Sequence, residues 1–411
     1  MQEERFQTIG KSQIRVDAFD KVTGRARYAD DLSMPRMLYA GCIHSIHPHA
    51  KVTIDKSKAL ALNGVAAVLT REDFPKSQSN LDFYYCTDEP KFIGDVIAVA
   101  AADSPELLEQ AKALVKITYQ DLPGVYTVQE ALKEDSPQVR EKGVGLTDGI
   151  PDASRKGNVF LESYKPLRKG NPEEGFAKSE VILERTYDTQ LVEHAYIEPE
   201  SVLTYYDDVN GLLTIRSCSQ QGHMPREFVA DALKLPMNKV RAIQCTVGGS
   251  FGGKFEMTGL MCARAALVTS KTGRPCKITY SREDSILESA KRHPFHTTIK
   301  IGADKSGKIL AYQSSQVENC GAYNNQAPWM NIRAMVHSAG PYKIDNIRTD
   351  TYGVYTNNPT PCAFRGYSSP QVIFGNEMIM DELARELGIS IVELKRKNLL
   401  EKGSRTATGQ T

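Results

Sequence analysis

The chain has 411 residues, of which 41% are hydrophobic and 25% are charged, and its formal net charge is +1. This balance is that of a globular protein with no bias towards nucleic acid or anionic membranes, and the length predicts two or three domains. The most apolar run, Val96–Ala102, is far shorter than the ~20 residues that span a bilayer, and the charged start Met1–Arg5 shows no secretory signal. We therefore expect a cytoplasmic protein.

The first third of the chain predicts an arm over residues 1–20 and a small α/β domain over 21–130. Within that domain Val65–Leu69 and Val96–Ala102 are expected as strands, and Ser104 should cap a helix that begins at Pro105. Residues 131–171 are polar and rich in Gly, Pro, Lys and Asp, which predicts a linker.

Strands dominate the expected second domain, residues 172–411, and alternate with a few helices. The final residues, 401–411, form a polar stretch rather than a finished domain end, so we expect another chain to continue the structure. The predicted class is mixed α+β. The expected strands are Val181–Tyr187, Ser201–Tyr206, Leu212–Ser217, Val240–Thr246, Cys276–Ser281, Thr297–Ile301 and Ile309–Glu318; the expected helices are Arg226–Leu235, Leu260–Lys271 and Pro370–Leu387, with another starting at Ser390.

The eight cysteines are scattered and include no C-x-x-C pair, which predicts reduced thiols and no zinc or iron–sulfur ligation within this chain. The eight histidines form no helical metal-binding pair, and we assign none of them a role.

A glycine-rich loop, Val247–Glu256, follows an expected strand and precedes an expected helix. Four glycines in six positions let another molecule approach bare backbone N–H groups, which suits an anion or an oxo group. The loop nearly matches the phosphate-binding pattern G-x-x-x-x-G-K-[ST], but Phe255 replaces the hydroxyl residue that would hold Mg²⁺. A nucleotide-binding enzyme is therefore kept only as a poorly fitting alternative.

Other motifs accompany this loop: Gln220, Arg292–Phe295, Ala363–Tyr367 followed by Pro370-Gln371, and His194–Pro199. Their order and separation resemble the molybdopterin-binding part of the xanthine dehydrogenase and aldehyde oxidase family. The opening, with Lys21–Gly24 and Ala29–Asp31, resembles that family's α/β hammerhead domain. The chain is most similar to the large subunit of the split form, of nicotinate dehydrogenase type, in which a second chain carries the rest of the molybdopterin domain.

The resemblance implies a molybdenum ion that is held by the dithiolene of a molybdopterin, expected in its cytosine dinucleotide form, with no direct protein ligand. It further implies partner subunits that carry the second molybdopterin half with a general-base glutamate, the 2Fe–2S clusters and FAD, arranged as a dimer of heteromers. The expected reaction is hydroxylation of an N-heteroaromatic substrate, xanthine or another purine or nicotinate, with oxygen from water.

The resemblance also implies roles for particular residues. The Gln220 amide would approach a molybdenum oxygen, and the Phe251 and Gly252 N–H groups would face the apical oxo group. Arg365 would lie against the metal or pterin. Gln220 as a strand-end glutamine and Arg365 as an ion-pair partner remain alternatives. The cofactor-binding set is completed by Gly249, Ser250, Gly253, Ala363 and Phe364.

For the substrate, the resemblance implies contacts from Arg333, Tyr367 and Phe255. Arg333 would pair with an oxygen or a carboxylate and Tyr367 would stack near the ring, with a surface ion pair and plain core packing as the respective alternatives. Phe255 stands where purine-oxidising animal relatives carry a glutamate, which favours a flatter and more apolar pocket. A cofactor-free assembly subunit is the alternative outside enzymes.

Overall fold

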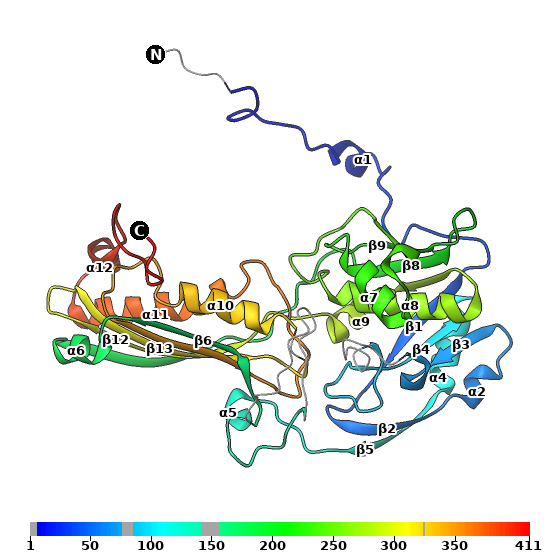
Figure 1. Ribbon diagram of the computed structural model, residues 1–411, viewed down its shortest axis with the longest axis horizontal. Helices are drawn as coiled ribbons and strands as arrows, with labels where there is room; N and C mark the ends of the chain where they lie inside the picture. Colours follow the sequence, from blue (N-terminus) through cyan, green and yellow to red (C-terminus); the bar gives the residue numbers. More distant parts are fainter. Residues whose placement is uncertain (1–5, 76–84, 141–156, 324) are drawn as a thin grey trace.

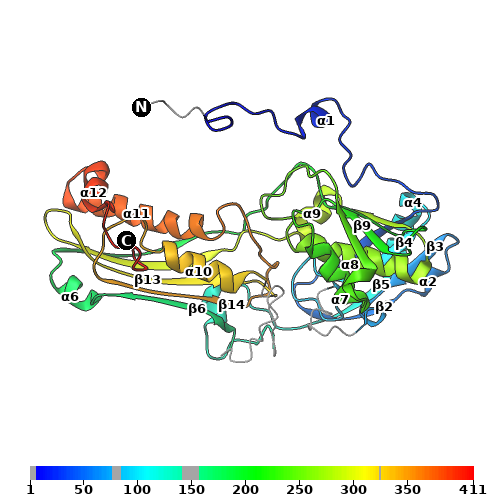
Figure 2. The same ribbon diagram turned by 45° about the horizontal axis from the view of Figure 1, so that its top comes forward.

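The computed structural model describes residues 6–75, 85–140, 157–323 and 325–411. Two sheets in two lobes dominate the shape, and the N-terminal arm runs outward from one of them (Figures 1 and 2). One sheet has seven strands and the other has five, and helices cover both, so the expected mixed α+β class is confirmed.

The seven-stranded sheet contains strands from both of the sequence regions that were expected to form separate domains. Strand β1 pairs in parallel with β11, so that Leu38 lies opposite Cys276. The division at residues 131–171 is therefore a division of the sequence and not of this sheet. In spatial order the strands are β10 (Val240–Gln244), β9 (Leu213–Ser217), β8 (Ser201–Tyr206), β11 (Cys276–Thr279), β1 (Leu38–His44), β4 (Val96–Ala102) and β3 (Val65–Leu69).

Helix α8, Met257–Thr272, is the central core element of this lobe. Every residue from Met257 to Thr269 is buried, as expected of a helix with no polar face. Helix α7, Met224–Leu233, packs closely on it, because a side chain at Gly259 of α8 would come within 2.8 Å of the Phe228 ring. The glycine-rich loop leads directly into α8, so this core fixes the position of the loop.

The β4 strand and the helix after it follow the sequence expectations. All seven residues of β4 are buried, and Ser104 caps α4, Pro105–Leu114, by accepting from the Leu107 N–H at 3.2 Å. A separate two-stranded ladder lies beside them. It consists of β2 (Ala50–Asp55) and β5 (Lys116–Asp121).

The five-stranded sheet forms the second lobe, with α10 and α11 on one face (Figure 2). Its edge strand β6 lies inside the stretch for which the sequence predicts a linker. In spatial order the strands are β6 (Val159–Lys169), β14 (Ile347–Val354), β13 (Ile309–Asn319), β12 (Phe295–Ala303) and β7 (Val181–Asp188); the helices are α10 (Ala327–His337), α11 (Ser369–Leu387) and α12 (Ile391–Asn398).

Short helical turns complete the fold. Among the described residues, no helix combines the length and apolar character that crossing a bilayer requires. The short helical turns are α1 (Ala18–Val22), α2 (Ser57–Leu60), η1 (Arg71–Asp73), α5 (Val128–Ala131), α6 (Pro172–Ala177), η2 (Met237–Lys239) and α9 (Arg282–Glu288).

Candidate active site

The glycine-rich loop meets the loop before α11 backbone to backbone. The Arg365 N–H donates to the Phe251 carbonyl oxygen at 2.8 Å. A Cβ at Gly252 would stand 2.7 Å from the Ala363 carbonyl carbon, and Gly252 also has φ of 109°. Only glycine combines that backbone conformation with so close an approach. The two motifs that the sequence places about 110 residues apart therefore form one site.

Two side chains on this junction are held in a rare backbone conformation. Phe251 has φ of 54° and Tyr367 has φ of 60°, both in the left-handed region that residues with a Cβ seldom occupy. Such conformations cost on the order of 1–3 kcal/mol and concentrate at functional sites. The strain presents Phe251, 49% exposed, at the tip of its loop.

A buried ion pair supports the loop from beneath. The Lys254 side chain is fully buried, and its Nζ lies 2.7 Å from Glu198 Oε2. The same carboxylate oxygen accepts from the Gly248 N–H at 2.6 Å. Lys254 therefore neutralises an internal carboxylate, and this contradicts the phosphate-binding role that the nucleotide-enzyme alternative requires.

The Gln220 side chain is anchored through its carbonyl oxygen. Gln220 Oε1 accepts from the Ser250 hydroxyl and from the Gly252 N–H, the latter at 3.1 Å. Two donors at Oε1 orient the amide, so its Nε2 is left as a donor without an acceptor in the described part of the chain. The Gly252 N–H is thus used by Gln220, which differs from the expectation that it faces an oxo group. The Phe251 N–H has no acceptor among the described residues.

These groups line a pocket of about 680 Å³ where the two lobes meet. The exposed Arg365 guanidinium on its wall has no hydrogen-bond or ion-pair partner within the described ranges. The pocket therefore presents several unpaired donors, which suits an anionic or oxo-bearing group. Its walls are formed by Gln220, Phe251, Gly252, Arg333, Ala363, Phe364, Arg365, Gly366 and Tyr367.

Four of the predicted site residues lie outside the walls of this pocket. Ser250 orients Gln220 from behind, and a Cβ at Gly249 or Gly253 would press on Tyr196. Phe255 packs against the core cluster around α8. Phe255 is partly buried and lies outside the pocket wall, and its contact with substrate stays a prediction.

A second hollow of about 590 Å³ continues from the first and shares Arg333 and Tyr367 with it. Arg333 donates from Nε to the Ser369 hydroxyl at 3.3 Å. Its two terminal nitrogens have no partner among the described residues, so a two-pronged donor faces the hollow. Trp329, 51% exposed, adds an aromatic surface to the same hollow.

A hydrogen-bonded chain that no sequence motif predicts fixes Tyr367. Its hydroxyl donates to Gln326 Oε1, and Gln326 Nε2 donates to the buried Glu256 carboxyl at 2.7 Å. Burial, with Cys362 and Glu256 nearby, raises the pKa of Tyr367 and keeps the phenol protonated. The phenol proton is therefore committed to Gln326, and the lone pairs on the phenol oxygen remain as acceptors.

The Phe364 ring is held between a histidine and an arginine. His194 stacks on it at 4.2 Å between centroids, and the Arg292 guanidinium lies 4.0 Å from its centroid. His194 Nε2 also lies 2.8 Å from the Ala363 carbonyl oxygen. Burial lowers the pKa of His194, and its Nδ1 lies 3.0 Å from the Ala290 carbonyl oxygen, so the ring ties the two segments together.

All eight cysteines are free thiols. In the described part of the chain one group, Cys42, His44 and Glu288, has metal-like spacing, but Arg264 bonds Glu288 and occupies that position.

Two family models match the chain and define its class. Residues 153–399 match the molybdopterin cofactor-binding domain, and residues 23–123 match the α/β hammerhead domain of aldehyde oxidase and xanthine dehydrogenase. The two matches define a molybdopterin-binding chain.

Relatives place it more closely. The chain is 38% identical to the nicotinate dehydrogenase large molybdopterin subunit of Eubacterium barkeri, over 98% of this chain and 92% of that one. It is 35% identical to a probable xanthine dehydrogenase subunit of Bacillus subtilis, over 94% of this chain and 50% of that one. The aldehyde oxidoreductase of Desulfovibrio gigas superposes with a TM-score of 0.85 at 29% identity, over 96% of this chain and 44% of that one.

The chain belongs to the xanthine dehydrogenase and aldehyde oxidase family, as a molybdopterin-binding subunit of a molybdenum hydroxylase. It is thus part of an oxidoreductase, as the motifs indicated.

Proposed function

We propose that this chain is the large molybdopterin subunit of a hydroxylase that acts on an N-heteroaromatic substrate. The observation that carries the proposal is the Gln220 amide, which Ser250 and Gly252 orient so that Nε2 points its protons away from the loop. Beside it the Phe251 N–H and the Arg365 guanidinium, neither of which has a partner among the described residues, supply further donors. This donor set fits the oxo-bearing end of a molybdenum–pterin cofactor, which, when bound, supplies the two-electron oxidation.

The second hollow supports the substrate class. Arg333 offers a planar pair of N–H groups to a carbonyl or carboxylate oxygen, and the Tyr367 oxygen offers an acceptor to a ring N–H. Trp329 and Phe251 provide apolar surface for a flat ring. Purines such as xanthine and pyridine carboxylates such as nicotinate both offer oxygens that can accept hydrogen bonds from Arg333. A purine also has a ring N–H that can donate to the Tyr367 oxygen.

The proposed assembly includes partner chains. The general-base glutamate and the second half of the pterin site are assigned to a second molybdopterin subunit, and 2Fe–2S clusters and FAD to further subunits that remove the electrons. We assign the cofactor the cytosine dinucleotide form, the complex a dimer of such heteromers and the cytoplasm as its compartment. The nicotinate dehydrogenase and xanthine dehydrogenase relatives, which are themselves described as subunits, support this plan.

The test is metal analysis and turnover of the natively purified complex. About one molybdenum per copy of this chain, several irons, and turnover of xanthine or nicotinate are expected. Gln220→Leu should lower turnover by about 10²-fold or more, the effect of losing one preorganised donor, while molybdenum content stays near one. Lys178→Leu, at an exposed position in the other lobe, is the control. Wild-type turnover by Gln220→Leu would refute the site, and a molybdenum-free complex with partners bound would establish the assembly subunit instead.

A further inference from the structure

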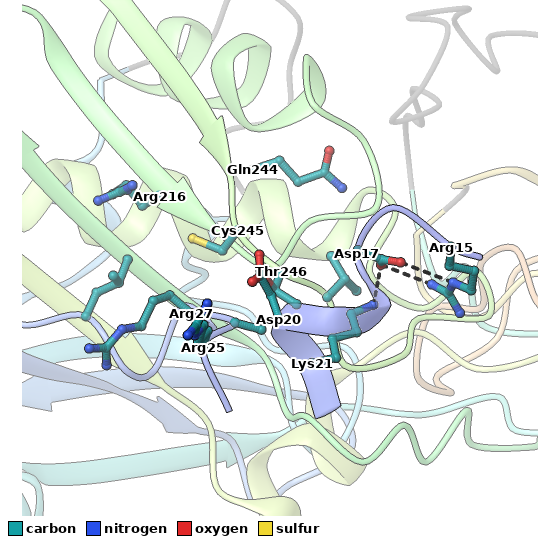
Figure 3. A pocket seen from close by; sticks show the side chains of 13 residues that line it. Arg15, Asp17, Asp20, Lys21, Arg25, Arg27, Arg216, Gln244, Cys245 and Thr246 are labelled. Atoms are coloured by element: carbon teal, nitrogen blue, oxygen red, sulfur yellow. Dashed lines mark hydrogen bonds and ion pairs between the residues drawn. The ribbon is translucent and has the colours of Figure 1, made fainter. Parts of the chain in front are cut away.

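A basic hollow lies at the foot of the N-terminal arm, between the arm and the ends of β9 and β10 (Figure 3). Its volume is about 700 Å³. Five basic side chains line it against two carboxylates, Asp17 and Asp20. The five are Arg15, Lys21, Arg25, Arg27 and Arg216.

The carboxylates do not neutralise this hollow. Asp17 pairs with Arg15 at 3.0 Å and with Lys21 at 2.7 Å. Within the described ranges Arg25, Arg27 and Arg216 have no carboxylate partner.

The buried Nε of Arg216 also lacks an acceptor in the described part of the chain. Buried donors are nearly always hydrogen-bonded in folded proteins, and like charges in one hollow repel. The basic hollow therefore calls for an anionic partner.

The arm that borders the hollow exposes an unusual run of apolar side chains. Helix α1 buries none of its residues, and Ile14 and Val22 are 90% and 82% exposed. The arm, residues 6–22, runs away from its lobe in both views (Figures 1 and 2). Water disfavours such a surface, and clustered exposed apolar groups mark interaction sites. The exposed set is Phe6, Ile9, Ile14, Val16, Phe19 and Val22.

We propose that the arm and the basic hollow form one docking surface for a partner protein chain whose surface carries an acidic rim beside an apolar groove. A small anion would neutralise the guanidiniums but leave the apolar side chains of the arm in water. A protein surface with both features satisfies both needs, as interfaces with an apolar centre and a charged rim do. The inference rests on the proposed function only in requiring a partner chain.

The surface is also continuous with the active site along the chain. Val247 lines the basic hollow and opens the glycine-rich loop whose tip, Phe251, lines the catalytic pocket. The docked partner therefore lies against the segment that positions Gln220 and Gly252. We therefore expect the partner to be a subunit that must lie near the catalytic pocket in order to function.

The first test reverses the charge of the hollow in the full complex. Arg25→Glu/Arg27→Glu/Arg216→Glu should raise the Kd for one partner chain at least about tenfold and make that Kd less dependent on salt, because the charged contacts are lost. Native mass spectrometry of the purified complex across a salt series measures both. Should Arg216→Glu prevent folding, the Arg25→Glu/Arg27→Glu pair at the foot of the arm tests the same contact.

Matched controls separate docking from general charge effects. Lys178→Glu/Lys305→Glu/Lys308→Glu makes an equal charge change at exposed positions of the other lobe and should leave the complex intact. Phe19→Ser/Val22→Ser should release the same partner chain, whereas Ile46→Ser, at a position 72% exposed elsewhere, should not. Molybdenum content is read in parallel, so that a failure of the proposed function is distinguished from a failure of docking.

A photo-reactive phenylalanine analogue in place of Val22 identifies the occupant. A crosslink to a partner peptide rich in Asp or Glu next to apolar residues supports the proposal. Crosslinks confined to this chain or to a second copy of it overturn the proposal. An intact complex in the triple arginine variant also overturns the proposal. This holds even where that variant binds inorganic pyrophosphate less tightly than the wild-type chain does.

Discussion

Replacing Gly252 by alanine should damage catalysis far more than stability. The new Cβ would lie 2.7 Å from the Ala363 carbonyl carbon and closer still to its oxygen, so the two loops must separate by about 1 Å to reach an ordinary contact. The φ of 109° adds backbone strain on the order of 1–3 kcal/mol. Since misplacement by 1 Å costs about 10²-fold in rate, turnover should fall about 10- to 100-fold.

Gly273→Ala provides the matched control. Gly273 also has a positive φ, 67°, but a Cβ there meets nothing within 4 Å, so only strain of about 1 kcal/mol is expected. Turnover per bound molybdenum and urea unfolding midpoints should be measured for both variants. Equal turnover of the two variants would refute the argument that the loop junction sets the catalytic geometry.

Three substitutions test neighbouring contacts. Gln326→Leu should raise KM and lower the free energy of unfolding by about 1–3 kcal/mol, because it removes a hydrogen bond from the buried Glu256 carboxyl. Steady-state kinetics and urea unfolding measure the two effects. An unchanged KM would contradict the prediction. Arg333→Lys should raise KM about 10-fold or more, because the planar guanidinium pairs two oxygens at once and an ammonium does not. The molybdenum content should stay unchanged. Equal KM values for the variant and the wild type would remove Arg333 from the substrate site. Burial opposes ionisation of Glu288, but Arg264 and His44 lower its pKa from 4.5 to about 2. The folded pKa lies below the unfolded one, so this stabilisation is present above about pH 4.5 and is lost as pH falls towards 2. Glu288→Gln should therefore make the unfolding midpoint depend less on pH over that range. An unchanged pH profile would contradict the assignment.

Local patterns predicted the elements whose signal is contained in a few neighbouring residues. The apolar run of β4 and the Ser104-Pro105 start of α4 are confirmed because burial and capping act within one turn or strand. Strand β6 was missed because its polar, basic sequence resembles a linker. The pairing of β1 with β11 was missed because no local pattern encodes which distant strand a strand joins.

The site divides in a similar way. Motif resemblance brought Gln220, the glycine-rich loop and Arg365 to one pocket, where the structure places them. It could not show that Phe255 packs against the core cluster around α8, since an aromatic after a glycine loop suits either environment. Gln326 was missed because its importance depends on Tyr367 and Glu256, which lie tens of residues away in the chain.

The pairing of Leu38 with Cys276 has a consequence for synthesis on the ribosome. At translation rates of about 5–20 residues per second, the 238 residues that separate these partners take roughly 12–48 s to appear. Through that interval β1 has one edge without its final neighbour, and unpaired strand edges promote aggregation. Production of this chain should therefore benefit from an ample supply of chaperones, which protect that edge until β11 has been synthesised.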